Sequence, residues 1–175
     1  DTTTILGGFG IYNLENITFK EMTVTNTSYG CHGLGHGIQV QIAEVELFDI
    51  AFKGCRNAGL FVRETISETT TVVATRCEFA NSSSGAILQG SLTSATFKNC
   101  VFHDNSGSGI WGRKNATIHL HGEATAIHSN RNNGITARNF AKVLIHLPSH
   151  HNTFYNNARE DRHAGGGGTI TNVED

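Results

Sequence analysis

The chain has 175 residues, a formal net charge of −2 at pH 7 and only 16% charged residues. Such a nearly neutral chain lacks the basic field that general nucleic-acid binding needs, and no apolar run approaches the ~18 residues of a membrane-spanning helix. Twenty glycines and a single proline indicate strands joined by tight corners, since glycine adopts positive φ without strain and proline removes a donor from a sheet.

Two short strands recur along the chain, each with apolar residues at alternate positions. The first carries the pairs Ile17/Phe19, Val45/Leu47, Val72/Ala74, Ala95/Phe97, Ile118/Leu120 and Val143/Ile145. The second carries Met22/Val24, Ile50/Phe52, Cys77/Phe79, Cys100/Phe102, Thr125/Ile127 and Asn152/Phe154, with a polar first member in the last two. A spacing of two places both members of a pair on one face, which we expect to be the interior. The sequence therefore predicts that Phe52, Phe79 and Phe102 are stacked inside.

A third strand follows, led by a glycine and carrying Gln or Arg four positions later. It occupies residues 37–41, 59–63, 85–89, 109–113 and 134–138, at intervals of 22, 26, 24 and 25 residues. Three strands per unit and no helical pattern predict an all-β solenoid of about six to seven coils. Equivalent residues on successive coils are expected to lie about 4.8 Å apart, in columns along the axis.

Asparagine recurs after the second strand, although its offset varies. The residues are Asn26, Asn57, Asn81, Asn105, Asn130 and Asn156. Asparagine tolerates the left-handed conformation, and its amide can stack on the amide of the next coil. We interpret these residues as turn formers.

The period breaks after Gly134, because Gly168 follows 34 residues later. We expect a single β-helix domain over 1–175, with coils over about 5–157, a charged and glycine-rich loop over 158–168 and a last strand over 169–173. The chain starts without Met and without a segment that would cover the edge of the first coil. On this ground we expect it to be part of a larger protein.

Cysteine spacing gives a weak guide to chemistry. Cys77 and Cys100 fall in the same aligned slot, where parallel side chains suit stacked free thiols better than a disulfide. No C-x-x-C motif supports a structural zinc site. Cys31, His32 and His36 share a glycine-rich loop and form a metal candidate without a fixed scaffold.

Two outward columns accompany the glycine-led strand and give the candidate binding residues. The first column reads Gln39, Phe61, Ile87, Trp111, Thr136, and the second reads Gln41, Arg63, Gln89, Arg113, Arg138. An apolar stripe beside guanidinium groups suits an acidic polysaccharide, because aromatic faces stack on sugar rings and Arg pairs with carboxylates or sulfates. The candidate contacts are Phe61, Arg63, Gln89, Trp111, Arg113 and Arg138. The alternative, which we favour, is that another chain or segment covers the stripe.

Histidines form a second set of columns: His121 and His146 share one column, and His103 and His128 share another. His119 shares a strand face with His121, so His119, His121 and His146 are candidate metal ligands. Ten histidines make chance neighbours common, and we interpret this region as a solvated polar face. No metal and no cofactor is predicted.

Residues 97–110 typify the repeat, and here the chain resembles the right-handed parallel β-helix proteins of the pectin-lyase-like superfamily. Similar short repeats occur in many bacterial, algal and viral proteins and in some ubiquitin-ligase receptors. The resemblance implies right-handed coiling with three parallel sheets. Lyases, hydrolases and epimerases of the superfamily work through clustered carboxylates, a calcium site or a poised basic residue. The acids here are scattered in sequence and the Asp-Pro-His motif of alginate epimerases is absent, so no catalytic residue is predicted.

The sequence therefore predicts a noncatalytic module that serves in assembly or surface attachment through its outer face. We expect this face to bind a protein partner or a second copy of the chain. The first alternative is binding of, or lyase, hydrolase or epimerase action on, an acidic polysaccharide. The second is recognition of a peptide along the solenoid, which the ubiquitin-ligase resemblance allows. An extracellular, virion or cell-surface location is favoured, and neither nucleic acid nor a membrane span is expected.

Overall fold

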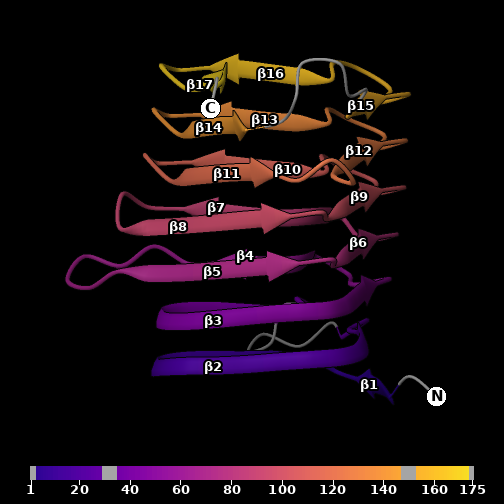
Figure 1. Ribbon diagram of the computed structural model, residues 1–175, viewed down its shortest axis with the longest axis vertical. Coiled ribbons are helices and arrows are strands. Elements are labelled where there is room, and N and C mark those ends of the chain that lie inside the picture. The colour runs from indigo at the N-terminus through magenta and orange to yellow at the C-terminus, as the bar shows by residue number, and fades with distance from the viewer. Residues whose placement is uncertain (1–2, 29–34, 147–152, 174–175) are drawn as a thin grey trace.

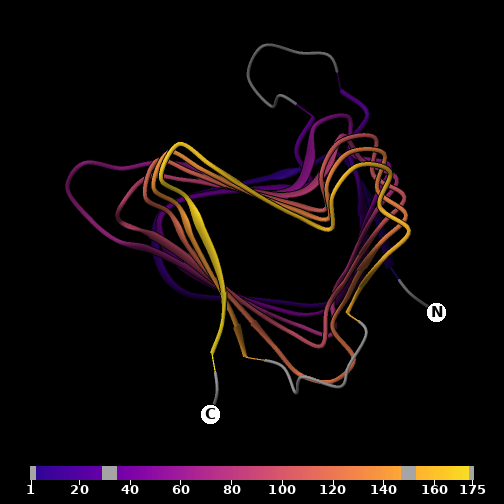
Figure 2. The same cartoon turned by 90° about the horizontal axis from the view of Figure 1, so that it is seen from above.

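The computed structural model describes residues 3–28, 35–146 and 153–173. Over these residues the chain forms seventeen strands and no helix, and every strand pairing is parallel. Figure 1 shows the coils stacked along the long axis, and Figure 2 shows them superposed as a three-sided ring. The predicted all-β parallel solenoid is confirmed, with about 6 turns.

Three ladders of strands make the three sides. Sheet 1 is the glycine-led ladder: the starts of β2 (Phe9–Thr25) and β3 (Ile38–Lys53), then β4 (Ala58–Val62), β7 (Ser84–Gln89), β10 (Ile110–Arg113), β13 (Ile135–Arg138) and β16 (Arg162–Gly165). Sheet 2 continues from the middles of β2 and β3 through β5 (Thr70–Thr75), β8 (Thr93–Lys98), β11 (Thr117–His121), β14 (Lys142–His146) and β17 (Thr169–Asn172). Sheet 3 comprises β1 (Thr3–Leu6), the ends of β2 and β3, β6 (Glu78–Ala80), β9 (Val101–His103), β12 (Ala126–His128) and β15 (Phe154–Tyr155). The long strands β2 and β3 run round the corners and join the three ladders (Figure 1).

The interior contains the predicted phenylalanine stack. Phe52, Phe79 and Phe102 are at most 1% exposed, with ring centroids 5.2 Å and 4.7 Å apart along the column. The stack also explains the glycines at the starts of β3, β4 and β7 in sheet 1, Gly37, Gly59 and Gly85, which lie against its rings. A Cβ at Gly85 would lie 2.8 Å from the Phe102 ring and 2.5 Å from the Gly109 carbonyl oxygen, so any larger residue would collide with the next coil.

Two columns, one residue apart, make the corner after sheet 3. Asn81, Asp104, Ser129 and Asn156 all have φ between 52° and 56°, a left-handed conformation that turns the chain. The next residue points inward instead, and Asn105 and Asn130 form a buried amide ladder.

In that ladder Asn105 Nδ2 donates to Asn130 Oδ1 at 2.9 Å, and Asn130 Nδ2 donates to Asn157 Oδ1 at 2.9 Å. The turn-former interpretation is thus confirmed for Asn81 and Asn156. For Asn105 and Asn130 the amide-stacking role holds, with Asn157 and not Asn156 as the third member.

The thiols behave as the sequence predicts. Cys55, Cys77 and Cys100 are free and buried, and Cys100 Sγ contacts the Ala74 carbonyl oxygen at 3.4 Å. Burial raises the pKa of the Cys100 thiol, and the neighbouring Cys77 adds to this rise. Stacked small hydrophobes therefore describe Cys77 and Cys100 well.

The segment 158–168 differs from the expected loop, because it contains β16, which pairs in register with β13 from Ile135↔Arg162 to Arg138↔Gly165. The sequence did not predict this strand because it carries Arg and His where earlier coils carry apolar residues. The strand is held instead by backbone hydrogen bonds to the coil before it. The last strand is β17, Thr169–Asn172.

Candidate functional site

The first outward column of sheet 1 has the predicted register. Phe61, Ile87, Trp111, Thr136 and His163 are successive pairing partners on adjacent strands. The column is not an exposed apolar stripe, however. Phe61, Ile87 and Trp111 are only half-exposed and Thr136 is 5% exposed.

Phe61 is covered by a histidine from the preceding coil. The Phe61 and His36 rings stack with centroids 4.5 Å apart, and His36 Nδ1 accepts the Ala58 backbone N–H at 3.3 Å. Burial lowers the pKa of His36 from 6.5 to about 4. His36 is therefore a neutral packing residue. Cys31 and His32, its expected partners in a metal site, lie outside the described residues.

The members of the second column differ in how exposed they are. Arg63 and Arg138 are exposed, Arg113 is half-buried with Cζ 4.8 Å from the Trp111 ring centroid, and Gln89 is only 9% exposed. The expectation that Gln89 faces a ligand is therefore wrong. It lies at the corner before Gly90 (φ 107°), where Glu64 of the preceding coil packs closely. The structure keeps Trp111, Arg113 and Arg138 together at one end of sheet 1.

Beside Trp111 lies a pocket of about 340 Å³. Its walls come from successive coils and are mainly hydroxyl, amide and charged groups: Ser83, Ser84, Gly107, Ser108, Trp111, Asn132, Asn133, Thr136, Arg138, Arg159, Glu160 and His163. Three of these, Arg159, Glu160 and His163, belong to the last coil. Sequence reasoning missed them, because that coil lacks the leading glycine and the apolar pair that mark the others.

A chain of hydrogen bonds crosses the pocket. Arg138 Nη2 lies 3.3 Å from His163 Nε2, and His163 Nδ1 lies 3.0 Å from Glu160 Oε2. Because a guanidinium can only donate, Nε2 accepts and Nδ1 carries the proton that Glu160 accepts. This arrangement fixes one tautomer of a neutral His163 and holds Arg138 at the rim.

Two buried polar atoms at this pocket have no hydrogen-bond partner within the described residues: the indole Nε1 of Trp111 and Oδ1 of Asn132. A buried donor or acceptor without a partner is costly. Both residues line the pocket, although these two atoms themselves have almost no accessible surface.

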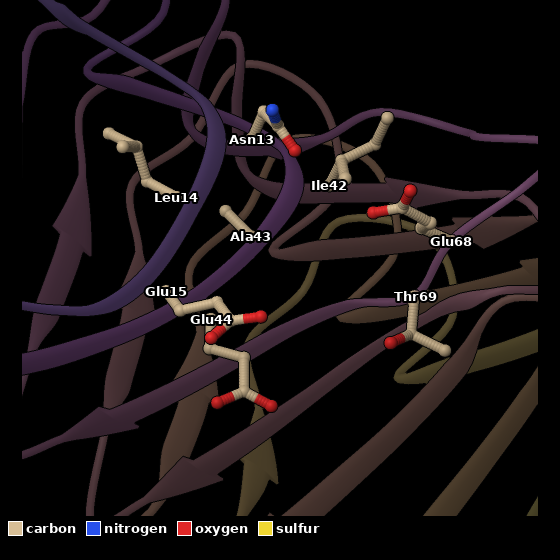
Figure 3. A pocket seen from close by; sticks show the side chains of 8 residues that line it. All are labelled: Asn13, Leu14, Glu15, Ile42, Ala43, Glu44, Glu68 and Thr69. Atoms are coloured by element: carbon tan, nitrogen blue, oxygen red, sulfur yellow. The ribbon is translucent and has the colours of Figure 1, made fainter.

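A second cavity, of about 580 Å³, lies at the corner after sheet 1. Figure 3 shows the side chains of Glu15 and Glu44 on one side of it and Glu68 on another. The sequence presented these acids as scattered, and the solenoid brings them to one place. No aromatic side chain and no cation lines this cavity among the described residues, so it lacks the groups that grip a sugar.

Histidines gather on the other two sheets. On sheet 2, His119, His121 and His146 each bring a ring nitrogen within 4.8 Å of the others. On sheet 3, His103 and His128 stack at 5.2 Å, and His103 lies between Glu78 at 3.0 Å and Asp104 at 2.6 Å. Both predicted histidine columns thus exist.

Comparison with known proteins adds the handedness of the coil. A family model described as a right-handed beta helix region matches residues 36–174. The chain belongs to the right-handed β-helix family. No curated protein and no solved structure matched the chain. Within the described residues, this β-helix also has no helix long and apolar enough to cross a membrane.

Proposed function

We propose that this β-helix is a noncatalytic carbohydrate-binding module and that the pocket between Trp111 and His163 is its binding site. The observation that carries the proposal is the composition of the pocket. An indole adjoins hydroxyls, amides and arginines in a space of about 340 Å³. A saccharide can stack the apolar face of its ring on an aromatic side chain, while the hydroxyls at the rim of the ring hydrogen-bond to polar side chains.

The charge at the pocket favours an acidic saccharide. Arg138 and Arg159 are exposed at its rim, and one carboxylate, Glu160, lies against His163. With His163 neutral, the lining carries one net positive charge. A uronate or sulfate group could pair with the Arg138 guanidinium, and sugar hydroxyls could hydrogen-bond to the hydroxyl and amide groups that line the pocket.

Binding without catalysis agrees with the acids present. Hydrolysis by paired carboxylates needs two acids roughly 5 to 9.5 Å apart. Glu160 is the single carboxylate among the described residues that line the pocket, and it already accepts from His163. Three other acids, Glu15, Glu44 and Glu68, line the separate cavity.

The structure supports the assembly hypothesis less well than the sequence pattern did. It required a broad exposed stripe, yet Phe61 is stacked on His36 and Ile87 is half-exposed. No feature of the described surface favours a peptide ligand over a sugar. A glycan-binding role fits a location outside the cell or on a cell or virion surface.

The test is a glycan array with uronate, sulfated and neutral polymers, run with Arg138→Ala and a matched control, Arg63→Ala. Both arginines are exposed in the same column, but only Arg138 lines the pocket. We expect the wild type to bind acidic polymers in a salt-dependent way, Arg138→Ala to lose most binding and Arg63→Ala to retain it.

Equal loss in both variants would contradict a localised site, and binding to no glycan would refute the proposal. Turnover of a bound uronate polymer, seen as new chain ends, would instead establish the enzyme alternative. A solution mass that falls in Trp111→Ala would favour assembly.

A further inference from the structure

Three histidines on the outer side of sheet 2 come from two adjacent parallel strands. His119 and His121 lie two residues apart on β11 and so point to the same side. His146 of β14 is the register partner of His121. His119 Nδ1 and His146 Nε2 are 3.1 Å apart, and the His121 and His146 rings stack at 4.2 Å. Neighbouring strands hold the cluster in place on both sides.

We propose that His119, His121 and His146 bind a divalent transition-metal ion of the zinc class, with solvent completing its coordination. Imidazole nitrogens suit Zn²⁺, Ni²⁺ and Cu²⁺, whereas Mg²⁺ and Ca²⁺ require oxygen ligands. Within the described residues no carboxylate belongs to the cluster, which excludes the oxygen-preferring ions. The site is separate from the pocket on sheet 1 and does not depend on the proposed function.

The distances suit a small ion. Zinc–nitrogen bonds of about 2.0–2.1 Å at tetrahedral angles place ligand nitrogens about 3.4 Å apart. The 3.1 Å pair already meets this requirement, and all three nitrogens lie within 4.8 Å. The His121 and His146 rings are nearly parallel, with an interplanar angle of 7°, so they must tilt toward each other. All three side chains are half-exposed, which leaves room for that rotation without backbone movement.

A nearby charge also affects the expected affinity of the histidine cluster for a metal ion. Lys98 is the register partner of His121 on the other side, and it is exposed. Its positive charge opposes a cation, so Lys98→Gln should tighten binding.

The experiment is equilibrium dialysis of the purified chain against Zn²⁺ at neutral pH, with the metal content measured. We expect about one Zn²⁺ per chain and an affinity at least about tenfold weaker in His121→Gln and in His146→Gln. His128→Gln is the matched control, since His128 is also half-buried and stacked, between His103 and Tyr155 on sheet 3. Excess Ca²⁺ should not displace the zinc.

The chain also contains His150 and His151, and a double variant His150→Gln/His151→Gln should retain binding. Far-ultraviolet circular dichroism confirms that each variant is folded. The proposal is overturned by a wild type that binds no more Zn²⁺ than His121→Gln/His146→Gln. It is equally overturned by loss of binding in the His128 or His150/His151 variants while His121→Gln and His146→Gln retain it.

Discussion

Replacing Phe79 with alanine tests the central stack of the solenoid. Phe79 is fully buried between Phe52 and Phe102 and meets the Phe97 ring edge-on at 5.8 Å. Truncating a buried phenylalanine costs about 3 to 5 kcal/mol, because the lost transfer free energy adds to the cost of the cavity. Each flanking ring is held by its own coil and cannot move in to fill the space. The stacked contacts add about 0.5 to 1.5 kcal/mol per pair, so we expect the upper end of the range.

The assay is urea denaturation followed by circular dichroism, with Phe140→Ala as the control. Phe140 is 62% exposed, so its truncation should change the free energy of unfolding by no more than about 0.5 kcal/mol. A loss under about 1 kcal/mol in Phe79→Ala would refute the reasoning, since it would mean that the neighbouring coils collapse into the space.

Three more predictions concern buried polar groups. Asn130→Ala removes a ladder amide, so the Asn105 amide and backbone N–H lose an acceptor and the Phe102 carbonyl loses a donor. It should cost about 1 to 3 kcal/mol in the same denaturation assay; an unchanged midpoint would contradict a structural ladder. His36 has a pKa of about 4 when folded against 6.5 unfolded, so the unfolded state binds more protons and stability falls as pH drops from about 6.5 toward 4. His36→Asn, whose Oδ1 can accept the Ala58 N–H, should lose less stability between pH 7 and pH 5, and an identical pH dependence would be evidence against this. Cys77 and Cys100 should resist thiol reagents in the native state and titrate as free thiols after unfolding without reductant; a mass two units lower mapped to the pair would show a disulfide.

The coil architecture is predictable because its causes are local and repeat. Period-2 pairs such as Cys77/Phe79 specify which side chains face inward, and the collision of a Gly85 Cβ with Phe102 explains why glycine returns in the coils that carry the phenylalanine stack. The sequence did not resolve the corners. Left-handed turn residues and ladder amides lie two and three positions after the inward phenylalanine, so a one-residue difference in offset separates Asn81 from Asn105 in role.

The proposed binding pocket was only partly predictable for a related reason. Trp111 and Arg138 lie in columns that the spacing reveals, and the structure keeps both at the pocket. Gln89 shares their spacing, but it is only 9% exposed and lies next to the Gly90 corner, where Glu64 of the preceding coil comes close. Strand alternation predicts which side of the sheet a side chain is on, but not whether a neighbouring coil covers it.

The pocket itself depends on the coil that departs most from the repeat. In β16, Arg162 pairs with Ile135 and His163 pairs with Thr136, so polar residues occupy slots that are apolar in earlier coils. A solenoid tolerates this because each strand takes its backbone hydrogen bonds from the coil beside it, whatever its side chains. The departure from the pattern is what brings Arg159, Glu160 and His163 against Trp111. The proposed pocket therefore lies where the repeat signal is weakest, and a search by repeat alone finds the scaffold but omits the three lining residues of the last coil.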